Sequence, residues 1–116
     1  LAIVTHTDER AKMAVIVKSE IKITKGFDTW QKMVKSQEDR IKEMGIKFLF
    51  AGTEKDGPNQ LHAIMMFPSM EALQAFGANE ELTEIRRQAG AVIESGKMTP
   101  ISEDYFVNYP DAFIKH

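Results

Sequence analysis

His62 is the residue of this sequence whose type and surroundings best suit chemistry. It lies in the apolar segment NQLHAIMMF, residues 59–67, and it is one of three histidines in the chain. Because histidine changes its charge near physiological pH, a histidine that faces a cavity can act as a general base or as a hydrogen-bond donor. The competing interpretation is an interface histidine hydrogen-bonded to a neighbour such as Glu20 or Asp104. We take His62 as the candidate catalytic residue, with both interpretations open.

A small set of side chains around His62 is predicted to bind a ligand. Glu20, Met66 and Phe106 fall on the same side of their predicted strands as His62. Tyr105 falls on the opposite side, but its hydroxyl can donate a hydrogen bond into a pocket. For the methionine and the tyrosine the alternative is a structural role, since methionine fills irregular gaps and strand tyrosines are usually structural. The predicted ligand-binding residues are Glu20, His62, Met66, Tyr105 and Phe106.

Other conspicuous side chains are more simply explained by structure. Trp30 is in helical phase with Phe27 and Val34, which favours a core position over ligand binding. Arg86 and Arg87 lie near the end of a predicted helix, where positive charge suits the helix dipole. An anion-binding role for this arginine pair is the less favoured alternative.

Several classes of function are not supported by the sequence. The chain has no cysteine, its histidines are far apart, and it lacks a glycine-rich phosphate loop, so we predict no metal and no cofactor. A net charge of −2 argues against a dedicated nucleic-acid binder, which usually carries a basic stripe. No apolar run approaches the roughly 18 residues of a membrane helix. These features, with 43% apolar and 28% charged residues, predict an ordinary cytoplasmic globular protein.

The elements that must position these side chains can be read from periodicity. Alternation of apolar and charged residues predicts a first strand over 13–23, and helical spacing predicts a helix over 28–44. β-branched and aromatic residues predict strands over 46–52 and 60–67, joined by an Asp-Gly turn. In the second strand, alternation places Ile46, Phe48 and Phe50 on one side and Lys47, Leu49 and Ala51 on the other.

The second half of the chain repeats this order. Ser69 is a suitable N-cap for a second helix, which is interrupted at 77–79 and, capped again by Asn79, ends at Gly90. Residues 91–100 read as a connector because they contain Gly96 and Pro100, and 101–108 as the fourth strand. We expect an extension over 1–12, whose LAIV pairs with a sheet edge, one domain over 13–108, and a tail over 109–116.

The order strand–helix–strand–strand–helix–strand is that of a ferredoxin-like α+β fold, with a four-stranded antiparallel sheet and two helices on one face. The other face would carry apolar side chains, namely Ile16, Leu49, Ile64, Met66 and Phe106. Leaving several of them in water would forfeit several kcal/mol at about 25 cal/mol per Å². We therefore predict a homodimer in which two copies of the chain cover this face for each other.

Four segments over residues 13–108 resemble the dimeric α+β barrel superfamily, which includes antibiotic-biosynthesis-monooxygenase-like proteins and uncharacterised families of marine microbes. They are FDTW, GIKFLFAG, FPSMEALQAF and NEELTEIRRQAG. The resemblance implies a dimeric α+β barrel. Oxygenases of this superfamily use an Asn, a Trp and a His or Arg around a cavity. The first strand here has no Asn and the third has no Trp, so no catalytic residue is carried over.

Three functions are consistent with these observations. The first is a homodimeric protein of uncharacterised role that binds a small apolar or aromatic molecule, in a cavity between helices and sheet or between two sheets. The second is a cofactor-independent monooxygenase or isomerase with His62 as general base. The third is a non-catalytic structural or regulatory dimerisation module with a filled interior.

Overall fold

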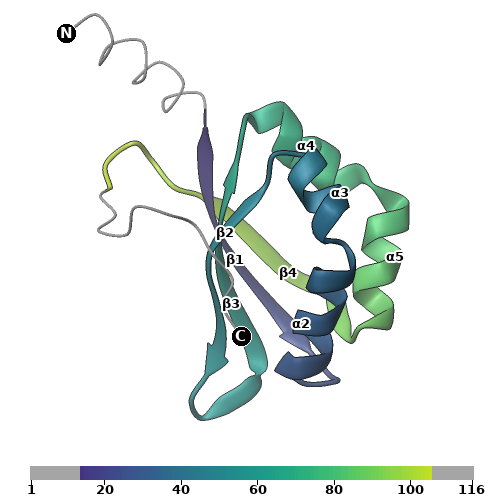
Figure 1. The fold of residues 1–116 in the computed structure, drawn as a ribbon. Coiled ribbons are helices and arrows are strands. Elements are labelled where there is room, and N and C mark those ends of the chain that lie inside the picture. The colour runs from purple at the N-terminus through teal and green to yellow at the C-terminus, as the bar shows by residue number, and fades with distance from the viewer. Residues whose placement is uncertain (1–13, 106–116) are drawn as a thin grey trace, which may run out of the picture.

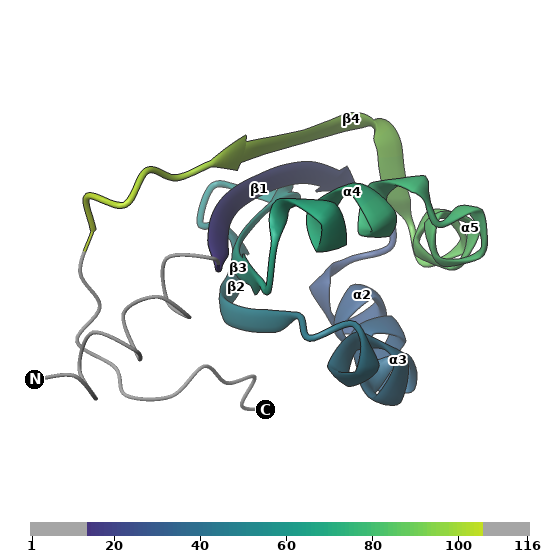
Figure 2. The same ribbon diagram turned by 90° about the horizontal axis from the view of Figure 1, so that it is seen from above.

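A four-stranded antiparallel sheet carries every described helix on one of its faces (Figures 1 and 2). The computed structural model describes residues 14–105. The elements are β1 (Val15–Ile23), α2 (Phe27–Ser36), α3 (Glu38–Glu43), β2 (Lys47–Glu54), β3 (Gly57–Phe67), α4 (Met70–Ala78), α5 (Glu80–Gln88) and β4 (Ala91–Pro100). The strand order β2-β3-β1-β4 confirms the predicted ferredoxin-like α+β fold.

Each of the two predicted helices consists of two segments. Gln37 separates α2 from α3, and Asn79 separates α4 from α5. The predicted caps are confirmed, because the Ser69 side chain accepts a hydrogen bond from Ala72 N at 3.0 Å and Asn79 Oδ1 accepts one from Leu82 N at 2.9 Å. The interruption at Asn79 therefore bends the helical layer without leaving its backbone donors unsatisfied.

The fourth strand lies earlier in the chain than the sequence predicts. Residues 91–100 form β4, whereas residues 101–105 form no strand, so the prediction of a strand over 101–108 is wrong within the described residues. Gly96 lies where the register between β1 and β4 shifts, and Pro100 ends an edge strand, a place where proline is tolerated. Both residues were interpreted as breaks, but here they mark a bulge and an end.

A second register shift changes the faces of β2. Phe48 pairs with Met65 and Phe50 pairs with the adjacent Ile64, so Leu49 is an extra residue in the ladder. Phe50 therefore lies on the side opposite to the helices and is 55% exposed. The prediction that Phe48 and Phe50 share a side is wrong, and Ala51 packs against the core instead.

The core fills the space between sheet and helices. Val17, Ile23 and Phe67 are its most deeply buried side chains. Trp30 is 6% exposed and packs edge-on against Phe48 at 5.9 Å between ring centroids, which confirms its core position. The predicted pairing of LAIV lies outside the described residues.

Candidate functional site

The sheet face that the helices leave uncovered is called here the open face. Its side chains follow from the ladder registers: Ile16, Lys18, Glu20 and Lys22 of β1, Lys47, Phe50 and Gly52 of β2, Gln60, His62, Ile64 and Met66 of β3, and Lys97 and Thr99 of β4. This face thus brings together three of the predicted site residues, Glu20, His62 and Met66. Ile16, Phe50, Ile64 and Met66 form its apolar part, and the charged part around Glu20 and His62 is adjacent to it along the strands.

The charged part is a row of side chains that satisfy one another across three strands. His62 Nε2 lies 2.6 Å from Glu54 Oε2, and His62 Nδ1 lies 3.9 Å from Glu20 Oε1. The other oxygen of Glu20 is 3.6 Å from Lys18 Nζ. Gly52 pairs with His62 in the ladder. The Phe50 ring lies over Gly52, because a Cβ at position 52 would be only 3.0 Å from Phe50 Cζ.

This row holds His62 by a hydrogen bond at Nε2, and the Glu20 carboxylate lies near Nδ1 beyond hydrogen-bond distance. A general base needs one nitrogen within hydrogen-bond reach of a substrate proton. With Glu54 on one nitrogen and Glu20 towards the other, the arrangement orients the imidazole strongly. The three pockets described below do not include His62 among their lining residues.

The remaining predicted ligand-binding residues are not brought to this row. Tyr105 is 45% exposed and follows the end of β4, where its backbone N–H donates to Glu103 O. Phe106 lies outside the described residues. Met66 pairs with Ile16 near the end of β1 distant from His62, in the apolar part of the open face.

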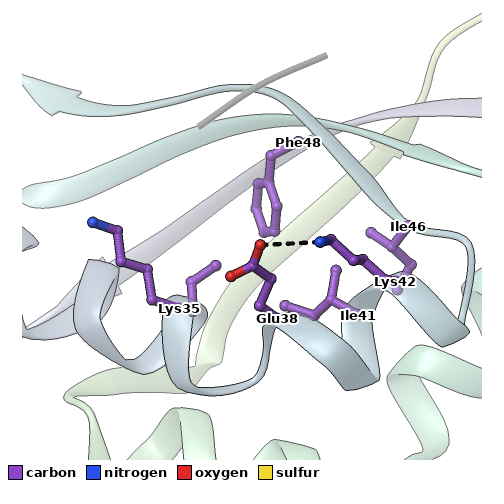
Figure 3. A pocket seen from close by; sticks show the side chains of 7 residues that line it. Lys35, Glu38, Ile41, Lys42, Ile46 and Phe48 are labelled. Carbon is purple, nitrogen blue, oxygen red and sulfur yellow. Dashed lines mark ion pairs between the residues drawn. The ribbon is translucent and has the colours of Figure 1, made fainter. Parts of the chain in front are cut away.

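On the helix side, a pocket of about 180 Å³ lies between α2, α3 and the edge strand β2 (Figure 3). Phe48, Ile41 and Ile46 supply apolar walls, together with Val34. The acid and one of the two lysines that line it pair with each other, since Lys42 Nζ lies 3.2 Å from Glu38 Oε1. This pocket therefore leaves no carboxylate of its own unsatisfied within the described part of the chain.

A second pocket, of about 190 Å³, lies between α4, α5 and the strands β1 and β4, and is called here the α5 pocket. It is lined by Ser19, Ile21, Phe76, Gly77, Thr83, Arg86, Ile93, Gly96, Lys97 and Met98. Ser19 is the buried polar side chain of the sheet, 8% exposed, and lies opposite Met98 on the helix-facing side. Lys97 pairs with Glu20 in the ladder, so its side chain belongs to the open face.

A narrow space of about 30 Å³ lies between these two pockets. It shares Ile41, Ile46 and Phe48 with the first pocket, and Phe76 and Arg86 with the α5 pocket. The Phe76 ring packs edge-on against Phe67 of the core. Small voids therefore continue from one edge of the sheet to the other beneath the helices.

Two consecutive arginines of α5 have opposite surroundings. Burial lowers the pKa of Arg86, whose guanidinium lies 5.1 Å from the centroid of the Phe76 ring. A hydrogen bond to Glu94 raises the pKa of Arg87, and Arg87 Nη1 lies 2.8 Å from Glu94 Oε1. The charge of Arg87 is thus compensated on the surface, while Arg86 pairs with no carboxylate among residues 14–105.

The sequence interpretation passed over the polar residues of the α5 pocket. Ser19 breaks the apolar alternation of its predicted strand, and that break was the signal of a polar group on a core-facing side. Arg86 was assigned to the helix dipole, because nothing in the sequence shows that it is half-buried while Arg87 is exposed. Thr83 carried no signal of its own.

Two further findings concern the described residues as a whole. Residues 14–105 contain no group of three or more histidine and acidic side chains that could hold a metal ion. No helix in the same range is long and apolar enough to cross a membrane.

Comparison with known proteins places the chain in a family. The sequence profile of a family described as Domain of unknown function (DUF3764) matches residues 6–103. A comparison of the sequence with curated proteins found no match.

Solved structures share the fold at low sequence identity. A conserved protein from Methanosarcina mazei Go1 has a TM-score of 0.60 and 14% identity, over 81% of this chain and 96% of that chain. SnoaB, a cofactor-independent oxygenase from Streptomyces nogalater, has a TM-score of 0.59 and 9% identity, over 83% and 98%. A candidate antibiotic biosynthesis monooxygenase from Caulobacter crescentus CB15 has a TM-score of 0.58 and 13% identity, over 84% and 95%. The likeness confirms the predicted monooxygenase-like α+β fold, and fold alone does not select a function.

Proposed function

This chain belongs to the DUF3764 family, and we propose that it is a homodimeric protein that binds a small apolar or aromatic molecule in the α5 pocket. The observation that carries the proposal is the pocket itself, about 190 Å³ between α4, α5 and the sheet. An apolar cavity of about 150 Å³ is large enough to hold benzene. Ile21, Ile93 and Met98 supply aliphatic walls and Phe76 an aromatic one.

A titration with toluene and phenol tests this binding. We expect saturable shifts of the Met98 methyl signal in NMR spectra, because Met98 lines the pocket. Gly77→Leu places a side chain at the pocket wall, and a Cβ there meets no atom within 4 Å. It should weaken binding, whereas Ala78→Leu, at the neighbouring exposed position, should not. Shifts that never saturate, or that are equal in both variants, would remove the pocket from the proposal.

The homodimer is supported by the apolar part of the open face. Phe50 is 55% exposed and pairs with Ile64, which lies two residues from Met66 on the same face of β3. Full burial of one such side chain is worth about 1.5–3 kcal/mol. The helices already cover the other face, so a second copy of the chain is the occupant we propose, with both open faces in contact.

The mass of the particle in solution tests the homodimer. Light scattering at micromolar concentration should return about twice the chain mass of 13.1 kDa. A single particle of 13.1 kDa at that concentration would exclude a stable dimer.

A second candidate function is a cofactor-independent monooxygenase or isomerase with His62 as general base. The short contact between His62 and Glu54 favours it, because a carboxylate that orients an imidazole is a common feature of catalytic histidines. SnoaB, one of the similar structures, is a cofactor-independent oxygenase. Turnover of a quinol substrate should fall at least about 100-fold in His62→Ala. Equal background rates in the two proteins would reject this candidate for that class of substrate.

A further inference from the structure

Arg86 is a cation in the helix–sheet layer without an acidic partner. Its guanidinium contacts the face of Phe76 and lines both the α5 pocket and the narrow space beside it. Residues 14–105 offer it no ion pair. A half-buried charge without a counter-ion is unfavourable, and in agreement with this the pKa of Arg86 is lowered by desolvation.

The side chains of the pocket around Arg86 offer more hydrogen-bond donors than acceptors. Ser19 and Thr83 bring hydroxyl groups, and within residues 14–105 neither side chain has a hydrogen-bond partner. No Asp or Glu is among the residues of the described chain that line the pocket. The Arg86 guanidinium has donors only, whereas each hydroxyl has one donor and two acceptor lone pairs. Donors are therefore in excess over acceptors among these side chains, and a ligand with acceptor oxygens would correct the imbalance.

The neighbouring residue shows that this imbalance is local. Arg87 follows Arg86 in the same helix, yet it is bonded to Glu94 at 2.8 Å and lies 3.6 Å from Glu84. Glu84 of this helix and Glu94 of β4 thus pair with the exposed arginine and not with the half-buried one. If α5 attracted anions along its whole length, both arginines would be expected to have an acidic partner.

We propose that the ligand of the α5 pocket is a small aromatic or aliphatic carboxylate whose anionic end is held by Arg86. This inference rests on the proposed small-molecule function and adds the chemical class of the ligand. A planar carboxylate matches the fork of donors on a guanidinium, and hydroxyl groups can complete its hydrogen bonds. Apolar walls around the rest of the pocket suit a hydrocarbon body better than a phosphate group, which is hydrated on every side.

Binding of benzoate, with benzamide as a planar neutral analogue, tests this proposal on the full chain. We expect benzoate to bind at least 10-fold more tightly than benzamide, with saturable shifts of the Met98 methyl signal in NMR spectra. Arg86→Met should reduce benzoate affinity at least 10-fold and leave benzamide affinity unchanged. Arg87→Met, the matched control that removes the same charge one residue away, should change neither.

Each failure has a distinct reading. If benzoate and benzamide bind the pocket equally well in both proteins, the ligand class is wrong and the small-molecule function stands. If neither compound binds, and toluene and phenol also fail, the pocket function falls and this inference with it. Inorganic phosphate that binds through Arg86 more tightly than benzoate would overturn the carboxylate class. Far-UV circular dichroism of each variant confirms that it is folded before affinities are compared.

Discussion

The two faces of the sheet carry polar side chains in opposite states. On the open face, Glu54, His62, Glu20 and Lys18 form a row in which each charged group has a partner. In the α5 pocket, Arg86 contacts the ring of Phe76 and has no acidic partner among residues 14–105. Satisfied groups have little left to offer a ligand, whereas an uncompensated cation favours an anionic partner. This difference supports the proposal that the open face contacts a second copy of the chain and that the α5 pocket binds a small molecule. His62 then belongs to the proposed contact surface and not to the proposed binding site.

The largest expected effect is on the association of the open face. Phe50→Glu places a charge at the most exposed large apolar side chain of that face, so its desolvation in a dimer would be costly. We expect the dimer dissociation constant to rise at least about 30-fold, corresponding to a loss of about 2 kcal/mol. Analytical ultracentrifugation measures it.

Met70→Glu is the matched control, since Met70 is 47% exposed but begins α4 on the helix side. It should leave dimerisation unchanged. If both variants dissociate the dimer equally, or if neither does, the open face is not the interface and the comparison fails on that side.

A smaller effect is expected on the stability of the unliganded chain when the pocket cation is removed. Arg86→Met retains most of the apolar stem and removes a half-buried charge without a counter-ion. The loss of its contact with Phe76 costs about 0.5–1 kcal/mol, and removal of the uncompensated charge is worth more. We expect a net gain of about 1 kcal/mol in urea unfolding. A clear loss of stability would mean that Arg86 is a structural residue and not a binding one.

A still smaller effect on dimerisation is expected from a change in the geometry of the open face. Gly52→Ala adds a Cβ that would lie 3.0 Å from Phe50 Cζ, so the ring above it must move. We expect a loss of about 0.5–1 kcal/mol of dimerisation free energy, with the same measurement as for Phe50→Glu. Gly77→Ala, on the helix side, serves as the control because the added Cβ meets no atom within 4 Å. Equal behaviour of the two alanine variants would indicate that the ring position does not matter.

The smallest effect is expected from the surface pair of Arg87 and Glu94. The pKa of Glu94 is lowered by its hydrogen bond to Arg87, so the pair stabilises the fold above the unfolded pKa of a glutamate, about 4.3. This contribution is lost as the pH falls through the lowered pKa of the folded state. Thermal unfolding of wild type and Glu94→Gln should therefore differ slightly at pH 7, and the difference should shrink as the pH is lowered below about 4. A difference that grows on acidification would contradict the sign.

The sequence predicted the fold because hydrophobic periodicity held along most of the chain and capping residues agreed with it in the second half. Ser69 and Asn79 marked both helix starts in the second half, and the alternation of β1 and β3 gave their faces correctly. Prediction failed at two of the three register shifts. A bulge at Leu49 moves Phe50 to the other face, and a bulge in β4 made a strand look like a connector. Bulges depend on pairing with a neighbouring strand, which no local pattern reports.

The two candidate sites also differ in how much of each could be predicted from the sequence. Glu20 was one of two predicted neighbours of His62, and the two residues do pair in the ladder, but the acid that bonds His62 is Glu54, which was not predicted. The half-buried state of Arg86 depends on how α5 packs against β1 and β4, and no local pattern distinguishes it from Arg87. Ser19 was visible as an exception in its strand, but its meaning appears only with the pocket beside it.

The methyl signals of two methionines provide the most direct test of the separation between the two faces. Met66 lies on the open face and Met98 lines the α5 pocket. In NMR spectra of protein labelled at the methionine methyl groups, dilution should shift the signal of Met66 and leave the signal of Met98 unchanged. Benzoate should shift the signal of Met98 and leave the signal of Met66 unchanged. A dilution series that moves Met98, or a benzoate titration that saturates at Met66, would contradict the account.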